Sequence, residues 1–181
     1  MRRVASVTVL TGALAAGLFA AGPAAQAQAK PAAPFKEASA VSQGLISKKD
    51  LVAEAKKSGG VTAKDQQAIA AATYCRSYTR YQGYKFSNGN WVGYVGNKLY
   101  WCYNGSRVTY AKATFKYYTY NKYRFVPRYW VHKSLTHRSD WAYATSYAQV
   151  KFYYTGNGKN YYPYANVRGY RNGAYRWTAG G

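Results

Sequence analysis

Two histidines and an aspartate are the residues of this chain whose types and spacing could do chemistry. His132, His137 and Asp140 fall within nine residues. Such side chains ligate metals or, with Ser134 or Ser139, form hydrolase triads. However, the two histidines are not spaced as a helical i,i+4 pair, the surrounding segment is basic, and no G-x-S-x-G motif accompanies the serines. We therefore expect exposed loop histidines, with no metal or other cofactor.

Carboxylates are too scarce for most acid–base chemistry. The 181 residues include 26 Lys and Arg but only 5 Asp and Glu, which gives a net charge of +21. Residues 75–181 contain 17 basic side chains and a single acidic one, Asp140. One carboxylate excludes a paired-carboxylate mechanism and a calcium or two-metal site within that segment. The sequence predicts that the protein is not an enzyme, and its charge predicts an anionic partner.

Tyrosines alternate with cations in the same segment. All 22 tyrosines lie from Tyr74 onward. Aromatic rings stack on sugars or bases, and Lys and Arg attract polyanions. The candidate binding residues are Lys116, Tyr118, Tyr120, Lys122, Arg124, Arg168, Tyr170 and Arg171. Alternatively, each tyrosine only fills a pleated surface and the lysines keep that surface soluble.

The first residues have the pattern of a secretory signal peptide, assigned to residues 1–29. Arg2 and Arg3 precede a small, apolar run that is followed by Ala27-Gln28-Ala29, a cleavage pattern. No later stretch is long and apolar enough to serve as a transmembrane anchor, so we expect a secreted protein. Secretion favours a disulfide between Cys75 and Cys102, which would stabilise the fold by about 3 to 4 kcal/mol.

Residues 30–73 differ in composition, because they are rich in Ala and Lys and contain one aromatic residue, Phe35. Ser47 with Asp50, and Thr62 with Asp65, have the spacing of helix caps, which predicts helices over 48–57 and 63–72. We expect an N-terminal arm, either flexible like a pro-segment or ordered by a protein partner.

Residues 74–181 are expected to form an all-β domain, a small antiparallel β-sandwich or open barrel. Short β-prone runs are separated by turn residues, and Asn104-Gly105 and Asn172-Gly173 have the pattern of two-residue hairpin turns. Alternation places Leu99, Trp101 and Tyr103 on one face of a strand and Tyr100 and Cys102 on the other.

A resemblance supports this expectation. The chain combines W-C-Y-N-G-S-R-V-T at Trp101–Thr109 with Y-x-P-x-x-x-V-R-G at Tyr161–Gly169 and a late Asn-Gly-x-Tyr. It resembles a group of small secreted β-domain proteins from actinobacteria. The resemblance covers residues 75–181 and implies a secreted β-fold in which Cys102 is a disulfide partner. It implies no catalytic residues.

Two functions remain as predictions. The first is a secreted, non-catalytic binding protein for an anionic or carbohydrate polymer or for a cell-envelope surface. The alternative is a protein of antagonism, either a cationic antimicrobial polypeptide or a small adaptor subunit of a secreted toxin complex that docks through residues 30–73.

Overall fold

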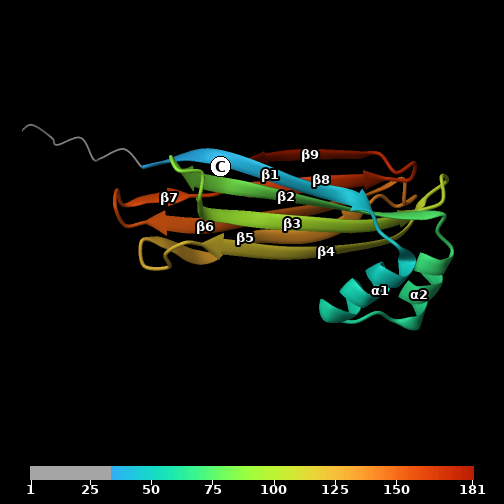
Figure 1. The fold of residues 1–181 in the computed structure, drawn as a ribbon. Coiled ribbons are helices and arrows are strands. Elements are labelled where there is room, and N and C mark those ends of the chain that lie inside the picture. Colours follow the sequence, from blue (N-terminus) through green and yellow to red (C-terminus); the bar gives the residue numbers. More distant parts are fainter. Residues whose placement is uncertain (1–33) are drawn as a thin grey trace, which may run out of the picture. The chain divides into compact units, whose positions relative to one another are not determined.

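A computed structural model describes residues 34–181, so the predicted signal peptide lies outside the described residues. Two helices and the β-strands follow one another along the chain (Figure 1). In order, they are β1 (Phe35–Leu45), α1 (Lys48–Lys57), α2 (Ala63–Ala70), β2 (Tyr74–Phe86), β3 (Trp91–Tyr103), β4 (Val108–Thr119), β5 (Phe125–His137), β6 (Tyr143–Tyr154), β7 (Lys159–Tyr161), β8 (Tyr164–Tyr170) and β9 (Tyr175–Gly180).

These strands form two antiparallel sheets, each built from consecutive strands of the chain. The N-terminal sheet has the order β1-β2-β3-β4, and the C-terminal sheet has the order β5-β6-β8-β9, with β7 also paired to β6. β7 and β8 pair with successive stretches of β6, and Pro163 lies in the break between them. Proline cannot donate a ladder hydrogen bond, which accounts for the break. The prediction of an all-β sandwich is confirmed.

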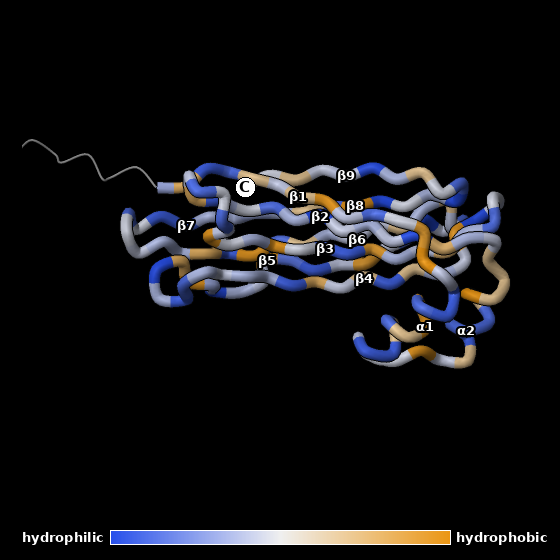
Figure 2. Tube along the Cα trace, in the orientation of Figure 1, coloured by the Kyte–Doolittle hydropathy of each residue, from blue (hydrophilic) through white to orange (hydrophobic). Residues whose placement is uncertain are grey.

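The core between the two sheets is built largely from aromatic rings. Trp101, Tyr78, Phe125 and Phe152 are among its largest fully buried side chains. Many strands are pale or blue in Figure 2 because tyrosine counts as weakly hydrophilic, although its ring carries a large apolar area. At the centre, the Nδ2 group of Asn97 donates to the carbonyls of Ser146 and Ala165, at 3.0 and 2.9 Å. This amide ties the N-terminal sheet to the C-terminal one.

A hairpin is present at Asn104-Gly105, but its connection between β3 and β4 has four residues instead of the predicted two. Gly105 has a φ of 89°, which favours glycine. The Asn104 side chain accepts hydrogen bonds from the backbone N–H groups of Ser106 and Arg107. The predicted alternation in β3 also holds: Leu99, Trp101 and Tyr103 face the C-terminal sheet, and Tyr100 and Cys102 face the helices.

The boundary expected at residue 74 is wrong, because residues 35–72 are part of the β-domain. β1 pairs with β2 along its whole length, from Phe35 opposite Phe86 to Leu45 opposite Arg76. The Phe35 ring lies 5.4 Å from that of Tyr84 and 5.5 Å from that of Phe125. Residues 35–45 are too polar to form a core of their own. They are ordered because β1 adds a strand to the sheet beside β2 and Phe35 adds a ring to the core of the β-domain.

Both helices predicted in this segment are present and have the predicted caps. Ser47 accepts from the N–H of Asp50, and Thr62 and Asp65 form a complete capping box. α2 ends at Ala70, two residues earlier than expected. None of the helices in residues 34–181 combines the length and apolar character that crossing a membrane requires.

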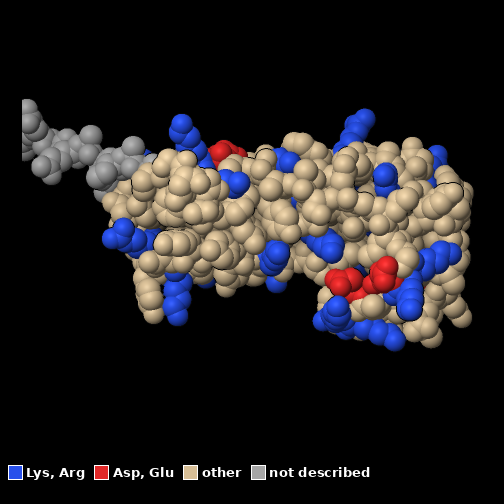
Figure 3. Space-filling view, in the orientation of Figure 1, with Lys and Arg blue, Asp and Glu red and all other residues tan. Residues whose placement is uncertain are grey.

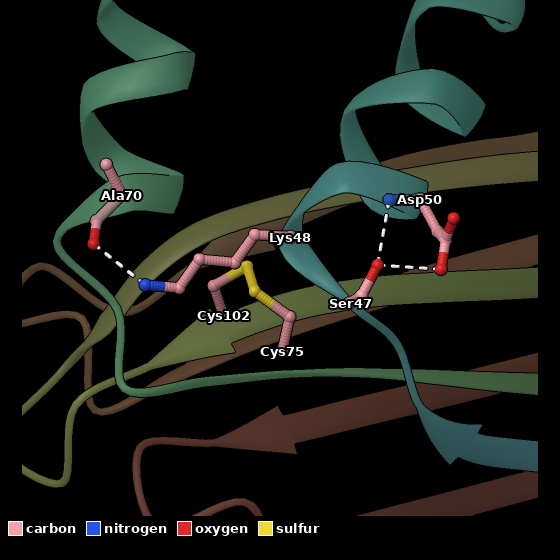
Figure 4. Close-up of a disulfide and its surroundings, with 6 residues drawn as sticks. All are labelled: Ser47, Lys48, Asp50, Ala70, Cys75 and Cys102. Atoms are coloured by element: carbon pink, nitrogen blue, oxygen red, sulfur yellow. Dashed lines mark hydrogen bonds between the residues drawn. A yellow bond between two sulfur atoms is a disulfide. The ribbon is translucent and has the colours of Figure 1, made fainter.

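The predicted disulfide between Cys75 and Cys102 is confirmed. The two cysteines lie opposite each other on β2 and β3, with their Cα atoms 4.0 Å apart. They face the helices, and Leu51 and Ile69 bury their side chains beside them. Across the disulfide, the Lys48 ammonium donates to the carbonyl of Ala70 at 2.9 Å, which links the start of α1 to the end of α2 (Figure 4).

Candidate polyanion-binding surface

Four aromatic rings gather on the outer face of the N-terminal sheet, beyond the part covered by the helices. We call them the aromatic platform: Tyr81, Trp91, Tyr94 and Tyr118. Tyr94 is central, with ring-centroid distances of 5.2 Å to Tyr81, 5.1 Å to Trp91 and 5.3 Å to Tyr118. Tyr94 and Tyr118 are directly opposite on β3 and β4, and their rings are nearly parallel. Strand pairing therefore assembles the platform.

A groove continues from the platform toward helix α1. This groove, which we call the lysine groove, has a volume of about 350 Å³ and is lined by strand residues and by the C-terminal turn of α1. Gly96 contributes to its floor, where an added Cβ would lie 3.0 Å from the Lys116 side chain and 3.1 Å from the Tyr81 ring. Glycine at this position lets both side chains lie close to the backbone.

Lysines at this surface lie over ring faces. The Nζ atom of Lys116 is 5.1 Å from the centroid of Tyr81 and 6.0 Å from that of Tyr94. Lys98 lies 4.5 Å from the ring of Tyr100. Within residues 34–181, neither lysine has a carboxylate within ion-pair distance. A cation over a ring is positioned without being neutralised, so its hydrogen-bond donors remain available to an anion.

One carboxylate, Glu54 of α1, also lines the groove. Lys57 lies 3.4 Å from Glu54, and the hydroxyl of Tyr100 donates to Glu54 at 3.2 Å. These hydrogen bonds, that of Lys57 first, lower the pKa of Glu54, while burial and the nearby carboxylate raise the pKa of Tyr100 to about 12. Glu54 therefore stays ionised and accepts hydrogen bonds, whereas a general acid requires a raised pKa.

Two of the predicted binding residues, Lys116 and Tyr118, lie on this surface. Tyr118 is 41% exposed and sits on β4, the edge strand of the sheet. Arg168 and Tyr170 lie instead on the outer face of the C-terminal sheet, on the opposite side of the sandwich. The predicted binding residues therefore do not share one face, because they belong to different sheets.

The other predicted binding residues lie in turns. Lys122 and Arg124 belong to the exposed β4–β5 connection, and Tyr120 packs its ring at 5.6 Å from that of Phe86. Arg171 lies in the β8–β9 turn, where it donates to the carbonyl of Ser106 at 3.4 Å.

The two histidines do not form a site with Asp140. Both lie in strand β5 and not in the loop we expected. His132 pairs with Gln149 on the outer face, while His137 pairs with Ala144 on the opposite face. The ring of His137 stacks on Trp141 at 3.6 Å, and Asp140 pairs with Arg138. In the described part of the chain, no cluster of His, Cys, Asp and Glu is arranged to hold a metal.

Sequence reasoning missed Tyr81, Trp91, Tyr94 and Lys98. All four lie in β2 or β3, on the face shared by Cys75 and Cys102. Counting in twos from Cys102 toward Tyr94 places Tyr100, Lys98 and Tyr94 on that face. That signal was present, but only the register of β2 brings Tyr81 beside them.

Comparison of the chain with protein-family models, with curated proteins and with solved structures gives no match, so the resemblance in Trp101–Thr109 stays a prediction.

Proposed function

We propose that this is a secreted, non-catalytic protein that binds an anionic glycan on the outer face of its N-terminal sheet. The observation that carries this proposal is the placement of Lys98 and Lys116, which line one groove beside partly exposed aromatic rings and, within residues 34–181, form no ion pair with a carboxylate. The disulfide and the predicted signal peptide support an extracellular location.

The charge of the molecule supports an anionic ligand. In residues 34–181 only two ion pairs form, Lys57–Glu54 and Arg138–Asp140, and both are exposed. Three of the five acids belong to the helical segment: Asp50, Glu54 and Asp65. Lys and Arg are spread over the strands (Figure 3). The strands therefore carry a positive charge that attracts a polyanion over long range.

The arrangement of the rings favours a glycan over stacked bases. Tyr94 and Tyr118 already stack on each other, and Lys116 lies over the face of Tyr81. Partly exposed rings of this kind offer their edges and hydroxyl groups, which hydrogen-bond to a hydroxylated chain. The lysine groove is large enough for a sugar unit with its anionic substituent.

The test is calorimetric titration of the protein with a short dextran sulfate fraction and with neutral dextran of the same length, at several salt concentrations. We expect binding of the sulfated chain alone, with affinity that falls steeply as salt rises. Replacement of both groove lysines (Lys98→Gln/Lys116→Gln) should lower the affinity at least about tenfold and flatten the salt dependence by about one counterion per lysine. Tyr118→Ala should weaken binding about tenfold without changing the salt slope, since an aromatic contact releases no counterions.

The matched control is Lys122→Gln/Arg124→Gln, which removes the same charge from the β4–β5 connection. If this control weakens binding as much as the groove variant does, net charge alone explains the affinity and the proposed surface is wrong. Equal binding of neutral dextran would refute the anionic ligand, and tighter binding of single-stranded DNA would refute the glycan.

A further inference from the structure

A second ordered array of rings and cations covers the outer face of the C-terminal sheet, and we call it the tyrosine face. Alternate residues of β6 point outward: Tyr143, Thr145, Tyr147, Gln149, Lys151 and Tyr153. Their neighbours on β5 and β8 add further rings and cations. At about 3.4 Å per residue, this row is close to 35 Å long.

Three cations of the tyrosine face, Arg168, Lys151 and Arg128, are held over rings. The guanidinium of Arg168 lies 4.3 Å from the ring of Tyr143, and its Nε donates to the Thr145 hydroxyl at 3.0 Å. Lys151 lies 5.4 Å from the ring of Tyr129 and 5.7 Å from that of Tyr162. Arg128 lies 5.1 Å from the ring of Tyr153.

Within residues 34–181, no side-chain carboxylate lies within ion-pair distance of these cations. The one acid of residues 74–181, Asp140, lies in the β5–β6 connection and is paired with Arg138 at 3.3 Å. Between the cations, the rings of Tyr147 and Tyr164 stack on each other at 5.9 Å. The tyrosine face thus repeats the chemistry of the aromatic platform: lysine or arginine over a ring, and tyrosines already stacked in pairs.

We infer that the tyrosine face is a second binding surface for an anionic glycan, and that the protein bridges two glycan chains. This inference rests on the proposed function of the N-terminal sheet. The positive charge of the tyrosine face is complementary to a polyanion. Its row of outward side chains matches the shape of an extended glycan chain. Because the two surfaces are the outer faces of opposite layers of a sandwich, a short chain bound to one cannot reach the other.

Two measurements on the whole mature protein test this inference. Calorimetry with a short dextran sulfate fraction should give two chains per protein molecule. Light scattering with long dextran sulfate should rise to a maximum at an intermediate ratio of protein to polymer and fall in excess polymer, as expected of a bridging molecule.

Variants separate the two surfaces. Lys151→Gln/Arg168→Gln should bind one short chain and lose the scattering maximum, and Lys98→Gln/Lys116→Gln should do the same. The combined variant should bind none. The control Lys122→Gln/Arg124→Gln should keep both the stoichiometry of two and the scattering maximum. Thermal unfolding of each variant, followed by circular dichroism, verifies that it is folded.

The outcomes distinguish this inference from the proposed function. One chain per wild-type molecule, with all binding lost in Lys98→Gln/Lys116→Gln, would overturn the second surface and leave the first intact. If the wild type binds one chain, and only Lys151→Gln/Arg168→Gln abolishes that binding, the proposed function of the N-terminal sheet is overturned. Two chains bound without a scattering maximum would overturn bridging.

Discussion

The indole of Trp101 lies over Gly169, so closely that a Cβ atom at residue 169 would be 2.5 Å from the Cδ2 atom of the ring. Trp101 comes from the N-terminal sheet and Gly169 from the C-terminal one. The indole Nε1 also donates to the carbonyl of Tyr170 at 3.2 Å. The two sheets therefore approach each other at a point where only glycine fits.

Gly169→Ala should destabilise the protein by about 1 to 3 kcal/mol, because the buried indole has to move to make room for the methyl group. The free energy of unfolding, measured by denaturant titration, checks this. Gly44→Ala is the control, since its added Cβ meets nothing within 4 Å and should change the free energy of unfolding little. Equal stability of the two variants would contradict the close approach.

Phe35→Ala should cost about 3 to 5 kcal/mol, because the Phe35 ring is buried among Tyr84, Phe125, Tyr154 and Tyr161. Val41→Ala, on the same strand, removes a side chain that is 50% exposed and should cost far less. The same denaturant titration measures both. If Phe35→Ala is as stable as the wild type, residues 35–45 are dispensable and the arm that the sequence suggested is the better description.

Replacement of Cys75 and Cys102 by Ser should lower the free energy of unfolding by about 2 to 4 kcal/mol, because the open chain gains conformational freedom in the unfolded state. A reducing agent should lower the stability of the wild type but not that of the double variant. Mass spectrometry of the unreduced protein after alkylation provides a direct check, and labelling of both thiols in the mature protein would disprove the bond.

Stability should fall as pH rises from about 10 to 12. Burial raises the pKa of Tyr100 and of Tyr110 to about 12, above the value of about 10 in an unfolded chain. The folded state therefore keeps protons that the unfolded state has lost, so their contribution is complete below pH 10 and disappears as pH approaches 12.

Denaturation midpoints across this pH range test that expectation. Tyr100→Phe should make the loss of stability shallower, because it removes one of the buried phenols. Tyr120→Phe, at a residue that is 65% exposed, should follow the wild type. If the two variants lose stability in parallel, burial of Tyr100 does not contribute to the alkaline transition.

The features that could be predicted from the sequence are local. The caps at Ser47 and Thr62 depend on residues three positions away, and the turn at Asn104-Gly105 depends on its own backbone and side chain. β1 was missed because its sequence is rich in Ala and Ser, and it is a strand only because β2 pairs with it.

The candidate surface was predicted only in part, for the same reason. Alternation could place Lys116 and Tyr118 on one face of β4, but it could not choose between the core and solvent. That choice depends on the register with β3, which sets Lys116 opposite Gly96 and Tyr118 opposite Tyr94. A one-residue slip would exchange the two faces.

The next-neighbour order of the strands bears on how the chain folds. Each of the strands β2, β3 and β4 pairs with the one before it. In the second sheet β6 pairs with β5, β7 and β8 both pair with β6, and β9 pairs with β8. The longest connection between paired strands is the segment between β1 and β2, and its two capped helices shorten the span to be closed. Little loop-closure entropy opposes any single pairing, which favours fast folding for an all-β chain. A chain that emerges with its N-terminus first can thus form the whole first sheet, including the disulfide, before the residues of the second sheet have emerged.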